Sequence, residues 1–162
     1  MGSEVQRDGN ARKIVYDLHV EFSRNPEKIR QAQMLTLNGK KPFLGLRGSR
    51  GLFGSEEWWE NIRLNNITTE SLFGTIIEVY SAGMDADGTP NTMVLQLQDG
   101  GPVELPIMVH DLRDLELFRL GNKVNFMYAL DELKVPSGPG RDGRYSRITL
   151  EIAVSQSVNS CS

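Results

Sequence analysis

The sequence is poor in cysteine and has no long apolar run. Cys161 is the one cysteine among 162 residues, so the chain offers neither a disulfide framework nor a cysteine zinc site. No apolar stretch approaches the roughly 20 residues that span a bilayer. The first residues also lack the apolar segment of a secretory signal peptide. We therefore expect a soluble, cytoplasmic protein that makes no membrane contact.

An excess of basic residues is also missing. The chain has 18 Lys and Arg against 21 Asp and Glu, which gives a formal net charge of −3. Proteins that grip nucleic-acid backbone usually carry a clear basic excess. The overall charge therefore argues against that role, although a local basic stripe remains compatible with it. The length and the ordinary globular composition predict one domain.

Signatures of catalysis and of metal binding are absent as well. His19 lies on the polar face of a predicted strand and His110 at a helix start, where surface or capping roles are expected. Asp131 and Glu132 are neighbours on a predicted strand and point to opposite faces. Residues 85–88 lack the third ligand and the final glutamate of a calcium loop. We predict a protein that is not an enzyme, with no cofactor and no metal.

The N-terminal part is predicted to be an extension over residues 13–66, after a disordered start at 1–12. Strict alternation over Ile14–Phe22 predicts a half-buried strand. Asn25 as cap and Pro26 at the first helical position predict a helix to about Leu35. Residues 41–46 are predicted to form a short strand, and Ser55 to cap a second helix.

Beyond residue 70 the pattern changes to strands. A long β-branched run, interrupted by Gly74, predicts a strand over residues 72–82. Apolar and polar residues alternate in period 2 over 93–98, 103–109, 124–130 and 148–154, which predicts four more strands. A helix is predicted over 111–120, between the third and fourth strands, and a loop over 136–143.

This order of elements is that of an OB-fold, a five-stranded Greek-key barrel. Gly74, inside the long first strand, fits the curl that closure of a barrel demands. The predicted fold is mainly β (a β-rich α+β class): an OB-like antiparallel barrel over 71–158, carried with the extension in one domain, 13–158, before a disordered tail, 159–162. Another small barrel and a meander-based α+β domain are the alternatives.

Glycine recurs at every third position from Gly45 to Gly54. One interpretation is an anion cradle, in which Arg47 and Arg50 clamp a ligand at the start of the helix that Ser55 caps. The other is a structural crossover in which glycine permits close backbone approach. The acidic first turn, Glu56 and Glu57, would repel a phosphate and favours the crossover.

Trp58 and Trp59 are the two tryptophans of the chain. On a helix, adjacent side chains point about 100° apart, so we expect one to be buried and the other to lie at the rim. A tryptophan at the rim could stack on a base, anchor a protein partner, or merely cover the end of the barrel.

A basic loop is predicted between the fourth and fifth strands, with Lys134, Arg141 and Arg144. Such a loop borders the ligand site of an OB-fold, and is also typical of a solvated, mobile segment. The second and third strands lack the aromatic residues on which a single-stranded nucleic acid stacks.

The leading hypothesis is a non-catalytic binding or adaptor module that contacts another protein, or a second copy of itself, through the extension and the barrel rim. The first alternative is an OB-type binder of single-stranded nucleic acid. The second is an enzyme or binder for an anionic, phosphate-bearing ligand at the glycine-rich stretch. The candidate binding residues are Arg47, Gly48, Ser49, Arg50, Gly51, Trp58, Trp59, Lys134, Arg141 and Arg144.

Overall fold

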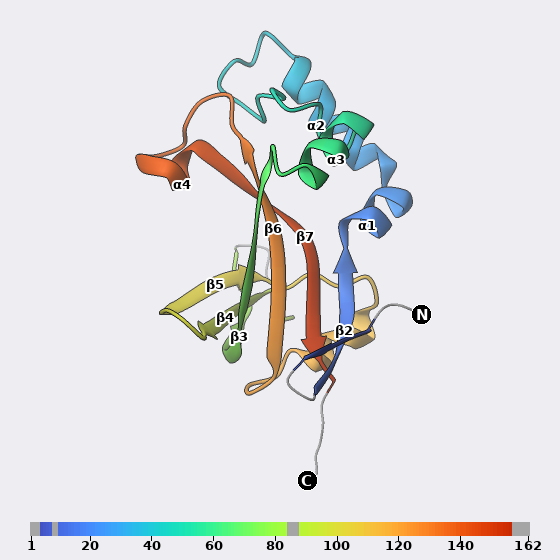
Figure 1. The fold of residues 1–162 in the computed structure, drawn as a ribbon, viewed down its shortest axis with the longest axis vertical. Helices are drawn as coiled ribbons and strands as arrows, with labels where there is room; N and C mark the ends of the chain where they lie inside the picture. Colours follow the sequence, from blue (N-terminus) through green and yellow to red (C-terminus); the bar gives the residue numbers. More distant parts are fainter. Residues whose placement is uncertain (1–3, 8–9, 84–87, 157–162) are drawn as a thin grey trace. The chain divides into compact units, whose positions relative to one another are not determined.

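The computed structural model describes residues 4–7, 10–83 and 88–156 (Figure 1). Cys161, the predicted tail at 159–162 and the turn around Asp85 and Asp87 lie outside these ranges. The elements in chain order are β1 (Glu4–Arg7), β2 (Asn10–Asp17), α1 (Leu18–Arg24), α2 (Pro26–Leu37), α3 (Glu56–Arg63), β3 (Thr68–Tyr80), β4 (Thr92–Leu97), β5 (Pro102–Pro106), the 3-10 helix η1 (Leu112–Leu117), β6 (Lys123–Glu132), α4 (Gly140–Arg144) and β7 (Tyr145–Ser155). No helix in these ranges is long and apolar enough to cross a membrane.

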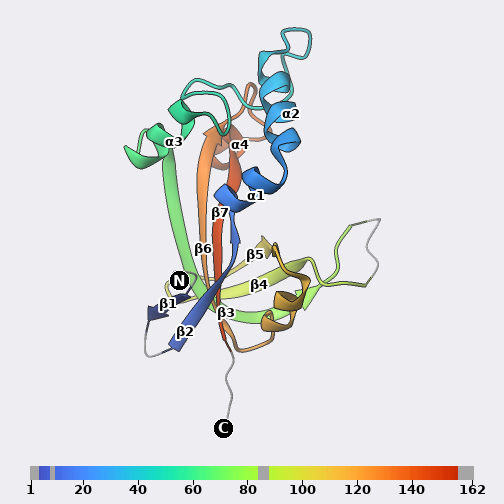
Figure 2. The same cartoon turned by 90° about the vertical axis from the view of Figure 1, so that its right-hand side faces the viewer.

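The strands form one open sheet with the order β1-β2-β7-β6-β3-β4-β5. The β1–β2, β2–β7, β3–β4 and β4–β5 pairs are antiparallel, and Figure 2 shows β3, β4 and β5 as neighbours. The predicted mainly β class, with helices near the N-terminus, is confirmed.

The predicted barrel is not found. All five expected strands are present, as β3 to β7, and closure would require β5 to pair with β7. Within the described ranges no such pairing exists, because β2 occupies the free edge of β7 with Arg12 opposite Ser155 and Asp17 opposite Glu151. Pro102 and Pro106 bound β5, and proline cannot donate to a further strand. The sheet therefore stays open at both edges.

The predicted strand over Ile14–Phe22 is wrong in its second half. The strand ends at Asp17, and Leu18–Arg24 form α1 instead. Leu18 and Phe22 are both buried, and a spacing of four residues places two side chains on one face of a helix. The apolar spacing over these residues therefore fits both the period of a strand and the period of a helix. Regular structure also begins earlier than predicted, with β1 and the start of β2 within residues 4–12.

Three further segments differ from or refine the expectations. Residues 41–46 form turns with a single bridge, Leu46 to Leu133, in place of a strand. The helix expected over 111–120 is the shorter 3-10 helix η1. The second half of the loop expected over 136–143 belongs instead to the five-residue helix α4.

The chain divides into two compact units. The first comprises Met1–Asp17, Ser71–Met127 and Glu151–Ser162, and the second comprises Leu18–Glu70 and Tyr128–Leu150. In the first unit, Met93 and Leu95 on β4 and Leu105 on β5 are at most 1% exposed, as period-2 alternation requires. In the second, Trp58 on α3 is fully buried, with Phe22 on α1 in the same core.

Candidate functional site

The glycine-rich stretch of the second unit runs between α2 and α3. Gly45, Gly48, Gly51 and Gly54 all have positive φ, between 78° and 99°, a region that residues with a Cβ rarely adopt. A Cβ on Gly51 would lie 2.8 Å from the backbone nitrogen of Trp58, and one on Gly54 would lie 2.9 Å from the Phe22 ring. This geometry fits the structural crossover, because each glycine is needed for close packing.

Of the two predicted clamp residues of this stretch, Arg47 contacts the end of β6. The Arg47 guanidinium donates a hydrogen bond to the Lys134 carbonyl at 3.1 Å, and its Nε lies 3.6 Å from a carboxylate oxygen of Glu132. The Ser49 hydroxyl donates to the same carboxylate at 3.3 Å. The Arg50 carbonyl accepts a hydrogen bond from Asn61. Arg47 and Ser49 thus hold the crossover to β6.

Lys134 closes the end of a helix. Its ammonium group donates hydrogen bonds to the carbonyls of Leu35, Asn38 and Lys41, at 2.7, 3.3 and 3.1 Å. The last carbonyls of a helix have no partner within it, so a cation there stabilises the C-terminus of α2. Of the other predicted basic residues, Arg144 is exposed at the end of α4, and the side chain of Arg141 is not described.

The two tryptophans divide as the helix geometry predicts. Trp58 is fully buried, and its indole nitrogen donates a hydrogen bond of 2.8 Å to the Asp131 carboxylate. Trp59 is partly exposed and stacks on His19, with ring centroids 3.8 Å apart. Phe22 and Phe53 complete the cluster through edge-on contacts. Trp59 is therefore the tryptophan that a partner could reach.

Asp131 is a carboxyl group inside this core, 3% exposed. Burial raises its pKa above the ordinary value, and the hydrogen bonds from Trp58 and from the Glu132 backbone amide act in the opposite direction. Asp131 is not directed at a ligand, because its partner is the buried indole.

Sequence reasoning missed an exposed apolar surface on the second unit. Met34 and Leu37 on α2 are 63% and 69% exposed, and Phe43 and Leu44 beyond its end are 75% and 54% exposed. We call these four residues the 34–44 surface. The spacing of Met34 and Leu37 places them on one face of α2, a helix with no buried residue. Exposed apolar groups gathered in this way mark interaction sites.

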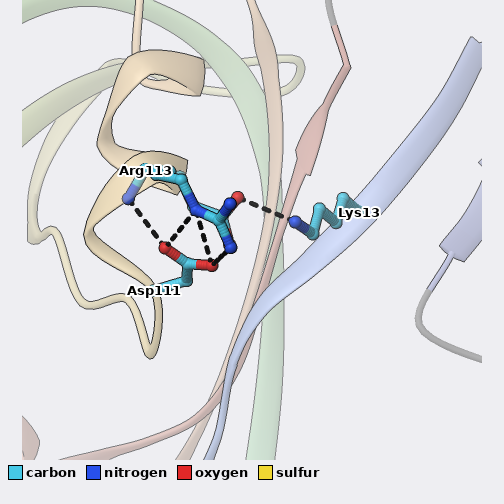
Figure 3. Close-up of polar contacts among 4 residues, drawn as sticks. Lys13, Asp111 and Arg113 are labelled. Carbon is cyan, nitrogen blue, oxygen red and sulfur yellow. Dashed lines mark hydrogen bonds and ion pairs between the residues drawn. The ribbon is translucent and has the colours of Figure 1, made fainter.

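Polar contacts in the first unit fasten η1 (Figure 3). Arg113 bonds back to Asp111 at 2.7 Å, and this hydrogen bond lowers the pKa of Asp111 to about 2. Lys13 on β2 forms an ion pair of 2.8 Å with Asp114. His110 accepts a hydrogen bond from the Asp17 backbone amide at 3.0 Å. These groups have structural roles, and no cluster of metal-ligating residues occurs in the part of the chain described.

One family model matches the chain over residues 12–155, and its description is Immunity protein RhsI2. The match covers most of both units, and the chain belongs to this family. Immunity proteins of this kind are non-catalytic, which confirms the prediction that the chain is not an enzyme. No curated protein matches the chain.

Proposed function

We propose that this member of the RhsI2 immunity family binds a cognate Rhs toxin and thereby blocks the toxin's activity. The family match carries the proposal, since it extends over residues 12–155. An inhibitor of this kind needs a complementary surface and no reactive group. In keeping with this, the polar side chains that sequence analysis singled out, such as Arg47 and Lys134, bond to the chain's own backbone.

The 34–44 surface is the part that we propose meets the toxin. It lies in the extension over residues 13–66, through which we predict from the sequence that the chain contacts another protein. Phe43 and Leu37 are among the most exposed large apolar side chains in the described ranges, at 75% and 69%. A few well-packed side chains near the centre of an interface carry most of its binding energy.

The charge of the second unit suggests the character of the opposing surface. This unit contains twelve Lys and Arg residues and nine Asp and Glu residues, whereas the first unit contains six and twelve. Lys40 and Lys41, both exposed, lie between Leu37 and Phe43. Complementary charge at an interface speeds association and selects the partner. We therefore expect an apolar patch with an acidic rim on the toxin.

The nucleic-acid alternative has less support. Trp58 is buried, and Arg47 and Lys134 are held by structural hydrogen bonds. A strand-binding groove would need these groups to be available to phosphates and bases. No described feature favours that function over protein binding.

The test is calorimetric titration of the purified chain with the toxic domain of its cognate Rhs protein. The wild-type chain is expected to form a complex. The double substitution of Leu37→Asp with Phe43→Asp should weaken it by about 2 kcal/mol or more, roughly 30-fold in Kd. Leu120→Asp is the matched control, because Leu120 is also exposed, at 66%, but lies outside the 34–44 surface. A folded wild-type chain that forms no complex would refute the proposal.

A further inference from the structure

A pocket of about 210 Å³ lies on the sheet of the first unit, between β3, β6 and β7. Its walls are mainly apolar, and three polar residues, Ser71, Asn125 and Glu151, line it as well. The apolar part comprises Leu72, Phe73, Phe126, Met127 and Ala153.

The strand period brings these groups to one face. Asn125 and Met127 are two residues apart on β6, and Glu151 and Ala153 are two residues apart on β7. Side chains two residues apart on a strand point to the same side of the sheet. The pocket therefore presents acceptor oxygens beside apolar walls.

Glu151 is a half-buried carboxyl group without a donor. Burial raises the pKa of Glu151 most. The negative charge of Asp17, which lies opposite on β2, raises it further. Within the described ranges, no hydrogen bond or ion pair reaches its carboxylate. A carboxylate so placed is destabilised by lost hydration and by a like charge, and a cation would relieve both effects.

Asn125 supplies a second acceptor that lacks a partner. Its Oδ1 atom is buried and accepts no hydrogen bond. A buried acceptor left unpaired costs about 1–3 kcal/mol. The terminal torsion of an amide is soft, so a modest rotation would turn this oxygen toward a donor in the pocket.

We propose that this pocket receives a basic side chain, an arginine in the first instance, from the protein that the chain binds. The proposal rests on the proposed function. An arginine has an apolar stem that suits the walls formed by Leu72 and Met127. Its planar guanidinium carries five donors, which can serve Glu151 and Asn125 together.

The neighbouring cations are compatible with this ligand. Arg12 lies over the Phe73 ring at 4.7 Å, and the Lys123 ammonium donates to the Thr75 hydroxyl at 3.0 Å. Both line the adjacent pocket, which shares Phe73, and neither lines this one. The charged side chain that lines this pocket is therefore the acidic Glu151, which lies opposite a second acidic residue, Asp17.

The experiment is an NMR titration of the isotope-labelled full-length chain with Nα-acetyl-arginine amide. The neutral analogue Nα-acetyl-citrulline amide is the comparison ligand. We expect saturable shifts at Asn125, Met127 and Glu151 with the arginine amide, with a Kd of about 1–10 mM, and none with citrulline. Glu151→Gln should weaken binding at least about tenfold. Glu78→Gln, an exposed position on β3, should leave it unchanged. Equal shifts with citrulline, no saturable shift, or an undiminished response in Glu151→Gln would each overturn the proposal.

The same variants separate this inference from the proposed function. If wild-type and Glu151→Gln chains bind the toxin domain equally well, the pocket is not part of the interface and the inference fails, while the proposed function stands. If neither chain binds the toxin domain, the proposed function fails. The arginine titration then still decides whether the pocket takes a basic side chain.

Discussion

The Trp58 indole nitrogen lies 2.8 Å from a carboxylate oxygen of Asp131, and both side chains are buried in the second unit. One group satisfies the other, since an indole N–H and a carboxylate are each costly to bury without a partner. Trp58 comes from α3 and Asp131 from β6. The pair thus joins the helix that follows the glycine-rich stretch to the sheet.

Replacing Trp58 with phenylalanine should destabilise the fold. Trp58→Phe removes the donor to Asp131 and leaves a small void, and we expect a loss of about 2–4 kcal/mol in the free energy of unfolding. Trp59→Phe, on the partly exposed neighbour, should lose about 1 kcal/mol, because phenylalanine keeps an aromatic ring for the contacts with His19, Phe22 and Trp58. Chemical denaturation of both variants measures the difference. Equal losses would contradict the role assigned to the hydrogen bond.

Stability should fall with rising pH through the titration of Asp131. Burial raises its pKa in the folded chain, so the folded state binds more protons than the unfolded one above the ordinary pKa of about 3.9. The stabilisation from protonation is complete below that value and is lost as the pH rises through the raised pKa. Denaturation of wild-type and Asp131→Asn chains across this range isolates the contribution, because the asparagine cannot ionise. A difference in the free energy of unfolding between the two chains that does not vary with pH would disprove this contribution of Asp131.

Alanine at Gly51 should be much worse than alanine at Gly39. Gly51 has a φ of 99°, and a Cβ there would meet the Trp58 backbone nitrogen at 2.8 Å. We expect Gly51→Ala to cost about 2 kcal/mol or more. A Cβ on Gly39 meets nothing within 4 Å, so that change should stay within about 0.5 kcal/mol. Thermal melting of the two variants provides the comparison, and similar melting temperatures would speak against a structural crossover.

Removing the Lys134 ammonium should loosen the end of α2. Lys134→Met keeps most of the apolar stem and removes the donor to three carbonyls, which should cost about 1.5–3 kcal/mol. Hydrogen exchange should accelerate at the Asn38 and Lys41 amides, whose bonds belong to the same turn. Arg144→Met, at an exposed position, is the control. Unchanged protection at Asn38 would show that Lys134 is not a cap.

Local signals predicted the local structure. Pro26 marked the start of α2, although the side chain of Asn25 makes no capping hydrogen bond there. Ser55, whose hydroxyl accepts a hydrogen bond from the Trp58 amide, marked the start of α3. The β-branched run and the alternation beyond residue 70 gave β3 to β7 because each strand buries one face. The spacing of Leu18 and Phe22 led to the wrong prediction of a strand, since a spacing of four residues fits a strand and a helix equally well.

Features that depend on contacts between distant parts of the chain could not be predicted from the local sequence pattern. Closure of the sheet depends on which strand takes the free edge of β7, and no local spacing shows that β2 does so. Lys134 looked like a ligand-binding cation because its partners, the carbonyls at the end of α2, are far away in sequence. Likewise, the exposure of Phe43 and the missing donor at Glu151 follow from packing and have no sequence motif.

Growth of cells that produce the toxic domain of the cognate Rhs protein tests the central claim most directly. Co-production of the wild-type chain should restore growth, and the Leu37→Asp, Phe43→Asp double variant should restore it poorly despite equal abundance. Leu120→Asp should protect as well as wild type. Failure of the abundant, folded wild-type chain to protect would contradict the account.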